Sequence, residues 1–262
     1  MKYVGSLFSK MAAYGVALLV AYSAAAVQAQ QQQGKAVVRA IRGSAQYTQG
    51  GDWMALEVGK ELTSSAVIKT AANSQVDLFL DQNGPVVRVT ADTVLALDSL
   101  KFEDSGAGMV IETKLNLTVG RILGSVKAMA AASKYEVKIP SGTVGIRGTE
   151  YDISANGVIN MKDGSVLADV TFNGQRYTMV VNAGQTFSPP GAAGGPPILT
   201  TLTPDMVKYL NDNFVEINGY VPPGGGEGGP APIIKPTVVP PNEPPVSPDT
   251  GTSGSESGSH PN

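Results

Sequence analysis

The sequence predicts an all-β fold, an antiparallel multi-stranded sandwich or roll of short strands, followed by one short C-terminal helix. Short runs of β-branched and apolar residues alternate with turn residues throughout 35–187. Asn-Gly or Asp-Gly pairs separate such runs at four places, and each pair favours a tight β-hairpin. Only 16% of the residues are charged, which favours half-buried strands over solvated helices. Regularly spaced short strands of this kind form sandwiches, rolls or small barrels.

Residues 1–29 have the pattern of a secretory signal peptide. Lys2 and Lys10 flank a short positive region, and the uncharged run that follows ends in the small-x-small pattern Val27-Gln28-Ala29. We therefore expect cleavage between Ala29 and Gln30. The alternative is an uncleaved membrane anchor, because the run of seventeen residues lies at the lower limit for spanning about 30 Å of hydrocarbon. In the mature form we expect a periplasmic or secreted protein.

Alternating patterns predict the first strands of the β-domain, which we expect over 35–187. One strand is expected at 36–41. Another, at 76–80, meets Asn83-Gly84 and returns as a strand at 86–89. Both central residues of a type I′ turn need positive φ, which glycine and asparagine tolerate, so the sequence predicts a type I′ hairpin here.

Three further turn pairs predict a meander in the second half of the domain. The pairs are Asn156-Gly157, Asp163-Gly164 and Asn173-Gly174. The strands expected around them are 151–155, 158–161, 166–171 and 176–181. Before this meander, the alanine-rich stretch 127–133 is expected to be a loop between strands, with a helical turn as the alternative.

The composition argues against several kinds of chemistry. The sequence has no cysteine, and its one histidine, His260, lies in a Gly/Ser-rich tail where nothing holds an imidazole in place. We therefore expect no histidine- or thiolate-based catalysis, no metal site and no cofactor. Asp77 and Asp81 share a strand face but lie about 13 Å apart at ~3.3 Å per residue. That exceeds the ~6.5–9.5 Å of paired carboxylates in inverting glycosidases, so we expect no enzyme.

Charge and aromatic content also limit the partners. The net charge is −3 and the basic residues are scattered, which does not fit a nucleic-acid-binding protein. Trp53 is the only tryptophan. We interpret it as an anchor in the core or at its rim, since an indole buries a large apolar area, with a ligand-stacking platform as the alternative.

Several motifs in 35–187 resemble those of the FecR domain family. They are Trp53-Met54-Ala55-Leu56 with Gly59 and Leu62, Ile68-Lys69-Thr70, Ser74-Gln75-Val76-Asp77-Leu78, Thr118-Val119-Gly120-Arg121-Ile122, and the run Tyr135 to Tyr151. Within that last run, the most specific element is the signature Gly145, Arg147, Gly148 and Thr149. This resemblance implies a non-enzymatic domain that acts outside the cytoplasm.

The residues of the signature run can also be interpreted physically. Gly142, Gly145 and Gly148 recur every third residue, which suits a bulged strand or close backbone contacts. We expect Arg147 to satisfy backbone carbonyls or a carboxylate, Glu150 or Asp152 among the candidates, with an anion- or partner-binding role as the alternative. Thr149 is expected to be a turn or cross-strand hydroxyl, with binding as the alternative.

The resemblance implies a function only in part. The best-known FecR proteins relay the occupancy of a siderophore transporter to a cytoplasmic sigma factor, through an anti-sigma segment and a C-terminal signalling domain. We see neither flank in this sequence and do not carry that role over. We expect a non-catalytic binding or scaffolding protein of the cell envelope, whose partner is an envelope protein or a glycan. The alternative is a periplasmic component of a FecR-type signalling system that works with a separate membrane partner.

The C-terminal third is predicted to contain one ordered element. Residues 188–201 are Pro/Gly-rich and are expected to be a linker. A helix is expected over 203–218, because Thr203-Pro204-Asp205 provides an N-cap, a proline at N1 and an acidic first turn. Its apolar stripe is expected to dock on the β-domain, with a partner-binding helix as the alternative.

The tail, 222–262, has 11 prolines and 8 glycines among its 41 residues. Such a segment cannot bury enough apolar surface to fold, and we expect a disordered tether with polyproline II character. The alternative to a simple tether is that two short runs within it, 232–236 and 238–241, are docking motifs.

Overall fold

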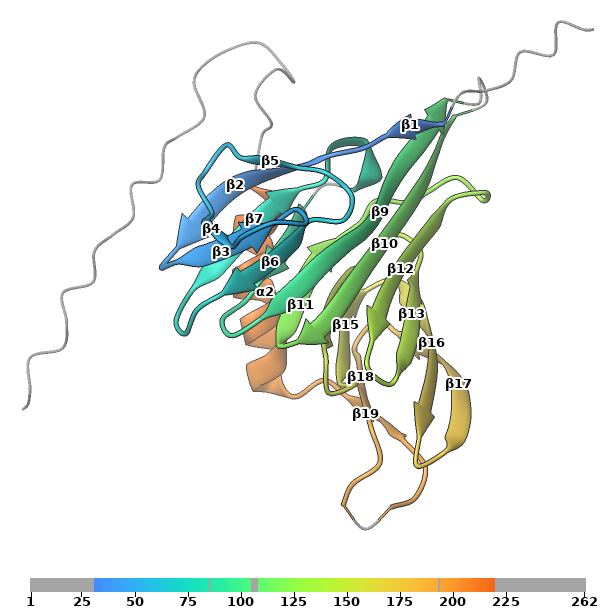
Figure 1. The fold of residues 1–262 in the computed structure, drawn as a ribbon. Coiled ribbons are helices and arrows are strands. Elements are labelled where there is room, and N and C mark those ends of the chain that lie inside the picture. The colour runs from blue at the N-terminus through green and yellow to red at the C-terminus, as the bar shows by residue number, and fades with distance from the viewer. Residues whose placement is uncertain (1–30, 85, 105–107, 193, 220–262) are drawn as a thin grey trace, which may run out of the picture. The chain divides into compact units, whose positions relative to one another are not determined.

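The computed structural model describes residues 31–84, 86–104, 108–192 and 194–219, and these form two β-sheets and one docked α-helix (Figure 1). All of them belong to the first of two units into which the chain divides, which ends at Pro222. The predicted signal peptide 1–29, with its cleavage point between Ala29 and Gln30, and the predicted tail 222–262 lie outside the described residues. No helix within the described ranges is long and apolar enough to cross a bilayer.

The larger sheet has ten strands among the described residues, and the short β1 (Gln32–Gln33) pairs with its strand β9. The order across it is β17 (Gln175–Asn182), β16 (Ser165–Phe172), β13 (Gly142–Ile146), β12 (Lys134–Ile139), β10 (Met109–Val119), β9 (Val94–Asp104), β6 (Val67–Thr70), β3 (Ala45–Thr48) and β4 (Met54–Ala55). We call it sheet A.

The second sheet, sheet B, has nine strands in the same part of the chain. Its order is β19 (Ile198–Thr201), β18 (Gln185–Ser188), β15 (Ile159–Asp163), β14 (Glu150–Ser154), β11 (Arg121–Ser125), β8 (Val86–Val89), β7 (Gln75–Phe79), β2 (Ala36–Arg42) and β5 (Glu61–Leu62). The pairs are antiparallel except for β10 with β12, which run parallel because the chain crosses into sheet B as β11 between them.

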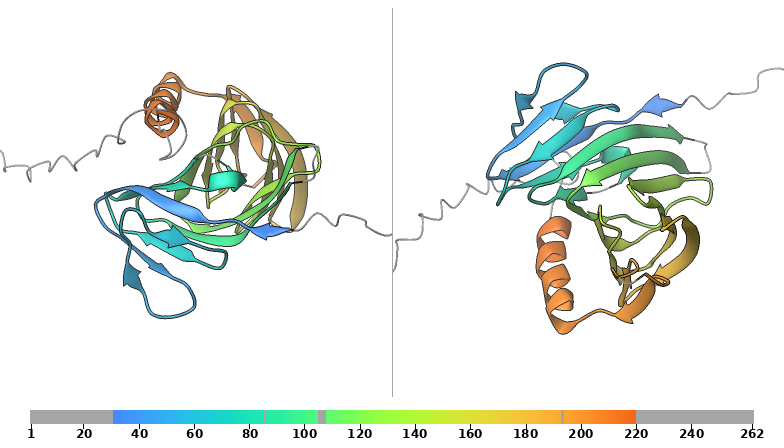
Figure 2. Two further views of the ribbon diagram at one scale, coloured as in Figure 1. Left: turned by 90° about the horizontal axis from the view of Figure 1, so that it is seen from above. Right: turned by 60° about the horizontal axis from the view of Figure 1, so that its bottom comes forward.

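The core lies between the two sheets, which face each other in the left view of Figure 2. Alternate residues of each strand point inward, as in β10, where Leu115 and Leu117 are buried and their neighbours are more exposed. Tyr135 from sheet A and Tyr151 from sheet B meet in this core, with their hydroxyl oxygens 3.3 Å apart. The predicted all-β fold with one C-terminal helix is thus confirmed.

Two of the predicted tight turns differ from expectation. β7 and β8 do pair as a hairpin, but the 3₁₀ turn η1 (Asp81–Asn83) joins them in place of a type I′ turn. Asn83 is fully buried there and donates hydrogen bonds to the carbonyl of Lys101 (2.8 Å) and to Thr113 Oγ1 (3.0 Å). These contacts with β9 and β10 outweigh the local turn preference.

The predicted meander is wrong at Asp163-Gly164. β14 pairs with β15 and β16 pairs with β17, but β15 lies in sheet B and β16 in sheet A, so the chain changes sheets at this point. Gly164 packs so tightly that an added Cβ would lie 2.5 Å from the carbonyl oxygen of Gly148. Of the four predicted turn pairs, Asn173-Gly174 alone has positive φ at both residues, 52° and 77°, whereas at Asn156-Gly157 only the glycine does (97°).

The C-terminal segment contains one strand more than expected. β19 forms inside the stretch predicted as a linker and extends sheet B at its edge by pairing with β18. Helix α2 (Pro204–Asn218) follows, and Thr203 caps it by accepting a hydrogen bond from the amide of Met206 (3.3 Å). The helix packs on the outer face of sheet B (Figures 1 and 2).

Candidate functional site

Helix α2 docks on sheet B through a short apolar stripe. Leu210, Phe214 and Ile217 are at most 1% exposed, and they pack in one cluster with Val86 of β8 and Leu123 of β11. These three helix positions follow the helical repeat, so they share one face. The cluster is separate from the core between the sheets.

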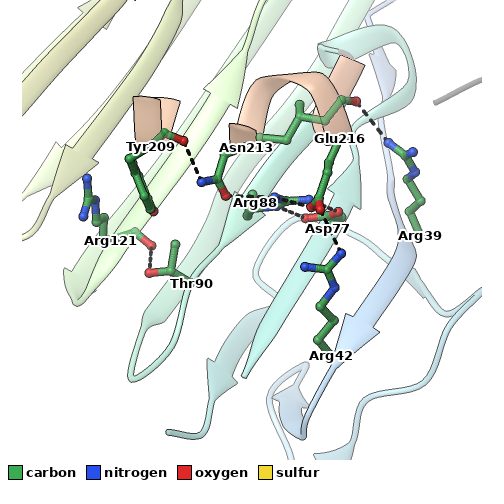
Figure 3. A network of polar contacts seen from close by, with 10 residues as sticks. Arg39, Arg42, Asp77, Arg88, Thr90, Arg121, Tyr209, Asn213 and Glu216 are labelled. Atoms are coloured by element: carbon green, nitrogen blue, oxygen red, sulfur yellow. Dashed lines mark hydrogen bonds and ion pairs between the residues drawn. The ribbon is translucent and has the colours of Figure 1, made fainter. Parts of the chain in front are cut away.

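A buried ion pair lies beneath the same helix (Figure 3). Arg88 of β8 faces Asp77 of β7 across the strand pair, and its guanidinium donates to both carboxylate oxygens at 2.7 and 2.9 Å. The two side chains are only 2% and 7% exposed. The third nitrogen of Arg88 reaches the helix, 2.9 Å from Asn213 Oδ1 and 2.9 Å from Glu216 Oε2.

A second arginine forms a matching pair on the neighbouring strands. Arg121 of β11 binds both carboxylate oxygens of Asp152 on β14, and Asp152 is fully buried. The guanidinium carbon of Arg121 also lies 4.6 Å from the ring centroid of Tyr209 on α2. Asp152 accepts a further hydrogen bond from Asn160 (3.2 Å), which in turn accepts one from Thr186 (2.8 Å).

Strand register places most of these groups in one row across sheet B. From one side to the other, the directly paired residues are Thr186, Asn160, Asp152, Leu123, Arg88 and Asp77. Arg121 lies two residues before Leu123 on the same strand, and therefore on the same face. The outer face of sheet B thus carries a line of polar groups in which every charge has an opposite partner.

Two more arginines hold the C-terminal end of α2 (Figure 3). Arg39 of β2 donates to the carbonyl oxygen of Ile217 (3.1 Å), and Arg42 donates to Glu216 (3.1 Å). The last turn of α2 has no basic residue of its own. Because carbonyls at a helix C-terminus lack intrahelical partners and carry partial negative charge, the sheet supplies the cations that the helix lacks.

The electrostatics of the site keep these groups charged. Burial acts to lower the pKa of Arg88, but its bonds to Asp77 and Glu216 raise that pKa overall. Burial likewise opposes the charged form of Arg121, and Asp152 raises its pKa overall. For Glu216, burial acts to raise the pKa, but Arg42 and Arg88 bring it below its ordinary value. The site is therefore a set of fixed charges.

A shallow cavity of about 530 Å³ lies beside the first half of helix α2, away from the arginines at its C-terminal end. Its lining combines apolar side chains with an ion pair formed by Lys162 and Glu150. The residues are Glu150, Lys162, Asp163, Gly184, Leu202, Val207, Leu210 and Asn211. Among the described residues, no three His, Cys, Asp or Glu side chains gather in a way that could hold a metal ion.

The site residues predicted from sequence lie elsewhere and do not come together. Trp53 is 46% exposed next to β4, at one edge of sheet A, and Arg147 follows β13, near the other edge. Six strand spacings separate β4 from β13, which is about 29 Å measured along the sheet at ~4.8 Å each. Thr149 is buried, and its hydroxyl has no hydrogen-bond partner among the described residues.

The signature run fixes the loop that joins β11 to β12. Arg147 donates to the carbonyl oxygen of Ala131 (3.0 Å), and the carbonyl of Thr149 accepts from the amide of Val126 (2.9 Å). Gly148 has φ = 63°, and a Cβ there would lie 2.9 Å from Ala128 Cα. Arg147 thus binds a backbone carbonyl, while Glu150 pairs with Lys162 and Asp152 with Arg121.

One sequence signal for the polar row is present on the paired strands β7 and β8. Asp77 and Arg88 each interrupt an alternating apolar strand, and the predicted hairpin places those strands side by side. Opposite charges on paired strands predict a cross-strand ion pair. Nothing local predicts the pairing of Arg121 with Asp152 or of Arg42 with Glu216, because each pair joins residues far apart in the chain.

One family model matches part of the chain. Residues 66–167 match the family model described as FecR protein, which confirms the resemblance. The matched segment runs from the residue before β6 into β16 and includes the signature run. The FecR family is regulatory and related to signalling. No curated protein matches the chain closely enough to count as a relative.

Proposed function

Because residues 66–167 form a FecR-type domain, we propose that this chain is a non-catalytic binding or scaffolding protein of the cell envelope, acting outside the cytoplasmic membrane. Its β-domain binds an envelope protein or a glycan. The observation that carries the proposal is the FecR match over the facing sheets, since proteins of this family typically face the periplasm.

The state of the acidic residues supports a binding role over a catalytic one. Asp77 and Asp152 are both held by two bonds from an arginine, and the carboxylate of Glu150 pairs with Lys162. These bonds occupy the carboxylate oxygens, and Asp77 and Asp152 are also buried, so both side chains serve the structure of sheet B.

The predicted signal peptide supports the location. We expect the mature chain to begin at Gln30, which N-terminal sequencing of protein from the periplasm or the culture medium can test. A chain that retains Met1 and sediments with membranes would support the uncleaved anchor. A chain found only in the cytoplasm would contradict the proposed location.

The main test is capture of an envelope component by the tagged full-length chain after cross-linking in cells. We expect a specific envelope protein or peptidoglycan fragment to be recovered. Trp53→Ala, next to the edge strand β4, and Arg147→Ala, after β13 toward the other edge, then show which part of sheet A makes the contact. Both positions are exposed, and circular dichroism of each variant checks that the loss of the Arg147 bond to Ala131 leaves the β-structure intact. Recovery of no component under cross-linking would contradict the proposal.

The second candidate is a periplasmic component of a FecR-type signalling system that works with a separate membrane partner. The family match favours it, because FecR proteins are related to signalling. Recovery of an integral membrane regulator in the same capture experiment would support this candidate. Recovery of peptidoglycan alone would favour scaffolding.

A further inference from the structure

Helix α2 is packed so that it can leave without opening the main core. Its buried side chains, Leu210, Phe214 and Ile217, belong to a small cluster with Val86 and Leu123. No residue of α2 belongs to the large cluster between the sheets. Local opening takes the least free energy where few apolar contacts are lost, and α2 meets that condition.

Two ion pairs of sheet B beneath α2 do not involve the helix, so they remain when it departs. Arg88 retains both bonds to Asp77, and Arg121 retains both bonds to Asp152. Burying a lone ion costs several kcal/mol, whereas an ion already paired within the sheet leaves no unpaired charge when the face is uncovered. This face combines paired charges, which water can solvate, with an apolar strip that suits another helix.

The side chains of this face determine which kind of helix can bind to it. We call it the α2-binding face and define it by Arg39, Arg42, Val86, Arg88, Arg121 and Leu123. It packs against apolar side chains at the spacing of positions 210, 214 and 217, and it forms ion pairs with one acidic side chain at position 216. Arg39 donates a hydrogen bond to a backbone carbonyl in the last turn of the helix. Recognition of an amphipathic helix by such a groove depends on this spacing and charge.

We propose that the α2-binding face is an exchangeable docking site, and that an amphipathic helix of a partner protein, acidic in its last turn, displaces α2 from it. This inference rests on the proposed function, because it names the kind of envelope protein that binds. Charge complementarity selects the occupant: three arginines, Arg39, Arg42 and Arg88, surround the place of the helix C-terminus. A released 15-residue helix is marginal in water, so docking and helix formation are coupled.

The test uses the full-length chain and a labelled synthetic peptide of residues 203–219 as the incoming helix. Phe214→Ala in the chain weakens the resident helix and leaves the sheet face unchanged. We expect the peptide to bind this variant at least about tenfold more tightly than the wild-type chain, measured by fluorescence anisotropy. Val215→Ala is the matched control, since Val215 is 75% exposed on the same helix, and it should leave binding unchanged.

A charge reversal tests the specificity. The peptide carrying Glu216→Arg should bind the Phe214→Ala chain at least about tenfold more weakly than the unmodified peptide. Adding Arg42→Glu to that chain should restore part of the binding of the reversed peptide. A peptide with Asp212→Arg is the control, because Asp212 pairs only with Lys208 of α2 itself among the described residues. Equal binding of all three peptides would overturn the proposed match of charges.

The proposal is overturned if the peptide binds neither chain while circular dichroism shows intact β-structure. Should Phe214→Ala fail to fold, Glu216→Gln, which loosens α2 without removing apolar contacts, takes its place. Envelope capture separates the two proposals. Capture without peptide binding overturns the exchange of α2 and leaves the proposed function standing. Peptide binding without capture overturns the proposed function, and with it the envelope partner, and leaves only the exchangeable face standing.

Discussion

At the scale of single residues, Arg88 shows that a buried charged side chain needs a bonding partner for each of its polar atoms. It lies on a sheet strand, 2% exposed, and each of its nitrogen atoms has an acceptor in Asp77, Asn213 or Glu216. Such a pair contributes little net stability, because the desolvation of both ions offsets their attraction. Its loss is nevertheless costly, since one ion would remain buried alone.

We therefore predict that Arg88→Ala lowers the free energy of unfolding by about 3–5 kcal/mol. The double variant Asp77→Leu with Arg88→Leu should recover most of this loss, because no unpaired charge remains. Urea denaturation followed by circular dichroism measures both. A double variant as unstable as the single one would contradict the explanation.

The glycines of the signature run are not equivalent. A Cβ at Gly142 would lie 2.1 Å from the carbonyl oxygen of Asp169, and Gly148 combines positive φ with the close contact to Ala128. At Gly145 the nearest atom is 3.8 Å away, which is ordinary contact. We predict losses of about 1–3 kcal/mol for Gly142→Ala and Gly148→Ala, and less than about 0.5 kcal/mol for Gly145→Ala. Thermal or urea unfolding of the three variants tests the order.

Tyr135 and Tyr151 predict how stability responds to alkaline pH. Burial raises the pKa of Tyr135 above its ordinary 10.0, and burial together with Tyr135 raises that of Tyr151 well above it. The folded state therefore favours the neutral phenols. Their contribution to stability is complete below pH 10 and is lost as the pH rises further.

We expect the double variant Tyr135→Phe with Tyr151→Phe to lose less stability than the wild type between pH 10 and pH 12. Both hydroxyls are removed together, so neither is left without its partner. Unfolding curves at intervals across this range provide the measurement. Parallel losses in the two proteins would show that these tyrosines do not govern the alkaline response.

At the scale of elements, α2 is held by apolar burial along its length and by arginines at its end. In the part of the chain that the structure describes, Glu216 is the only acid of the helix that forms an ion pair with the sheet. It faces Arg42 of β2 and Arg88 of β8, with Asp77 of β7 behind Arg88. Its pKa lies below the ordinary 4.5, so the charged form favours docking. That contribution is present above about pH 4.5 and is lost as the pH falls through the lowered pKa.

We predict that α2 loosens on acidification below pH 4.5 before the sheets unfold. NMR signals of the Leu210 and Ile217 methyl groups should report the change, while those of Ile153, in the main core, should not. Glu216→Gln should already be loosened at pH 7 and show a flatter response. Simultaneous loss of all three signals would mean that α2 has no separate opening.

Local sequence patterns predicted where the strands and the helix lie better than they predicted which strands pair with each other. Alternation located most of the strands, and the cap at Thr203-Pro204 located α2. Turn chemistry was correct at Asn173-Gly174, where the two strands pair directly. It failed at Asn83 and Asp163-Gly164, because buried contacts with distant strands decide the geometry there.

At the scale of the whole molecule, the order of strands depends on sheet changes that no local signal marks. The parallel pair β10 and β12 arises because β11 belongs to the other sheet, and the signature run holds the returning loop. The signature run could be identified from the sequence. Its structural role, which is to hold the loop between β11 and β12, became visible only in the folded chain. The polar row beneath α2 likewise combines strands from 75 to 188 and could be inferred only at the Asp77–Arg88 hairpin.

The end of α2 that Arg39 and Arg42 bind is also the point where the chain continues beyond Gly219. A pull applied through that part of the chain enters the domain at the C-terminus of α2, where Arg39 and Arg42 bind it. No residue of α2 belongs to the main core, so we expect these bonds and the small apolar cluster to break before the strands of the core separate. Tension on the C-terminus would therefore uncover the α2-binding face while the β-domain stays folded.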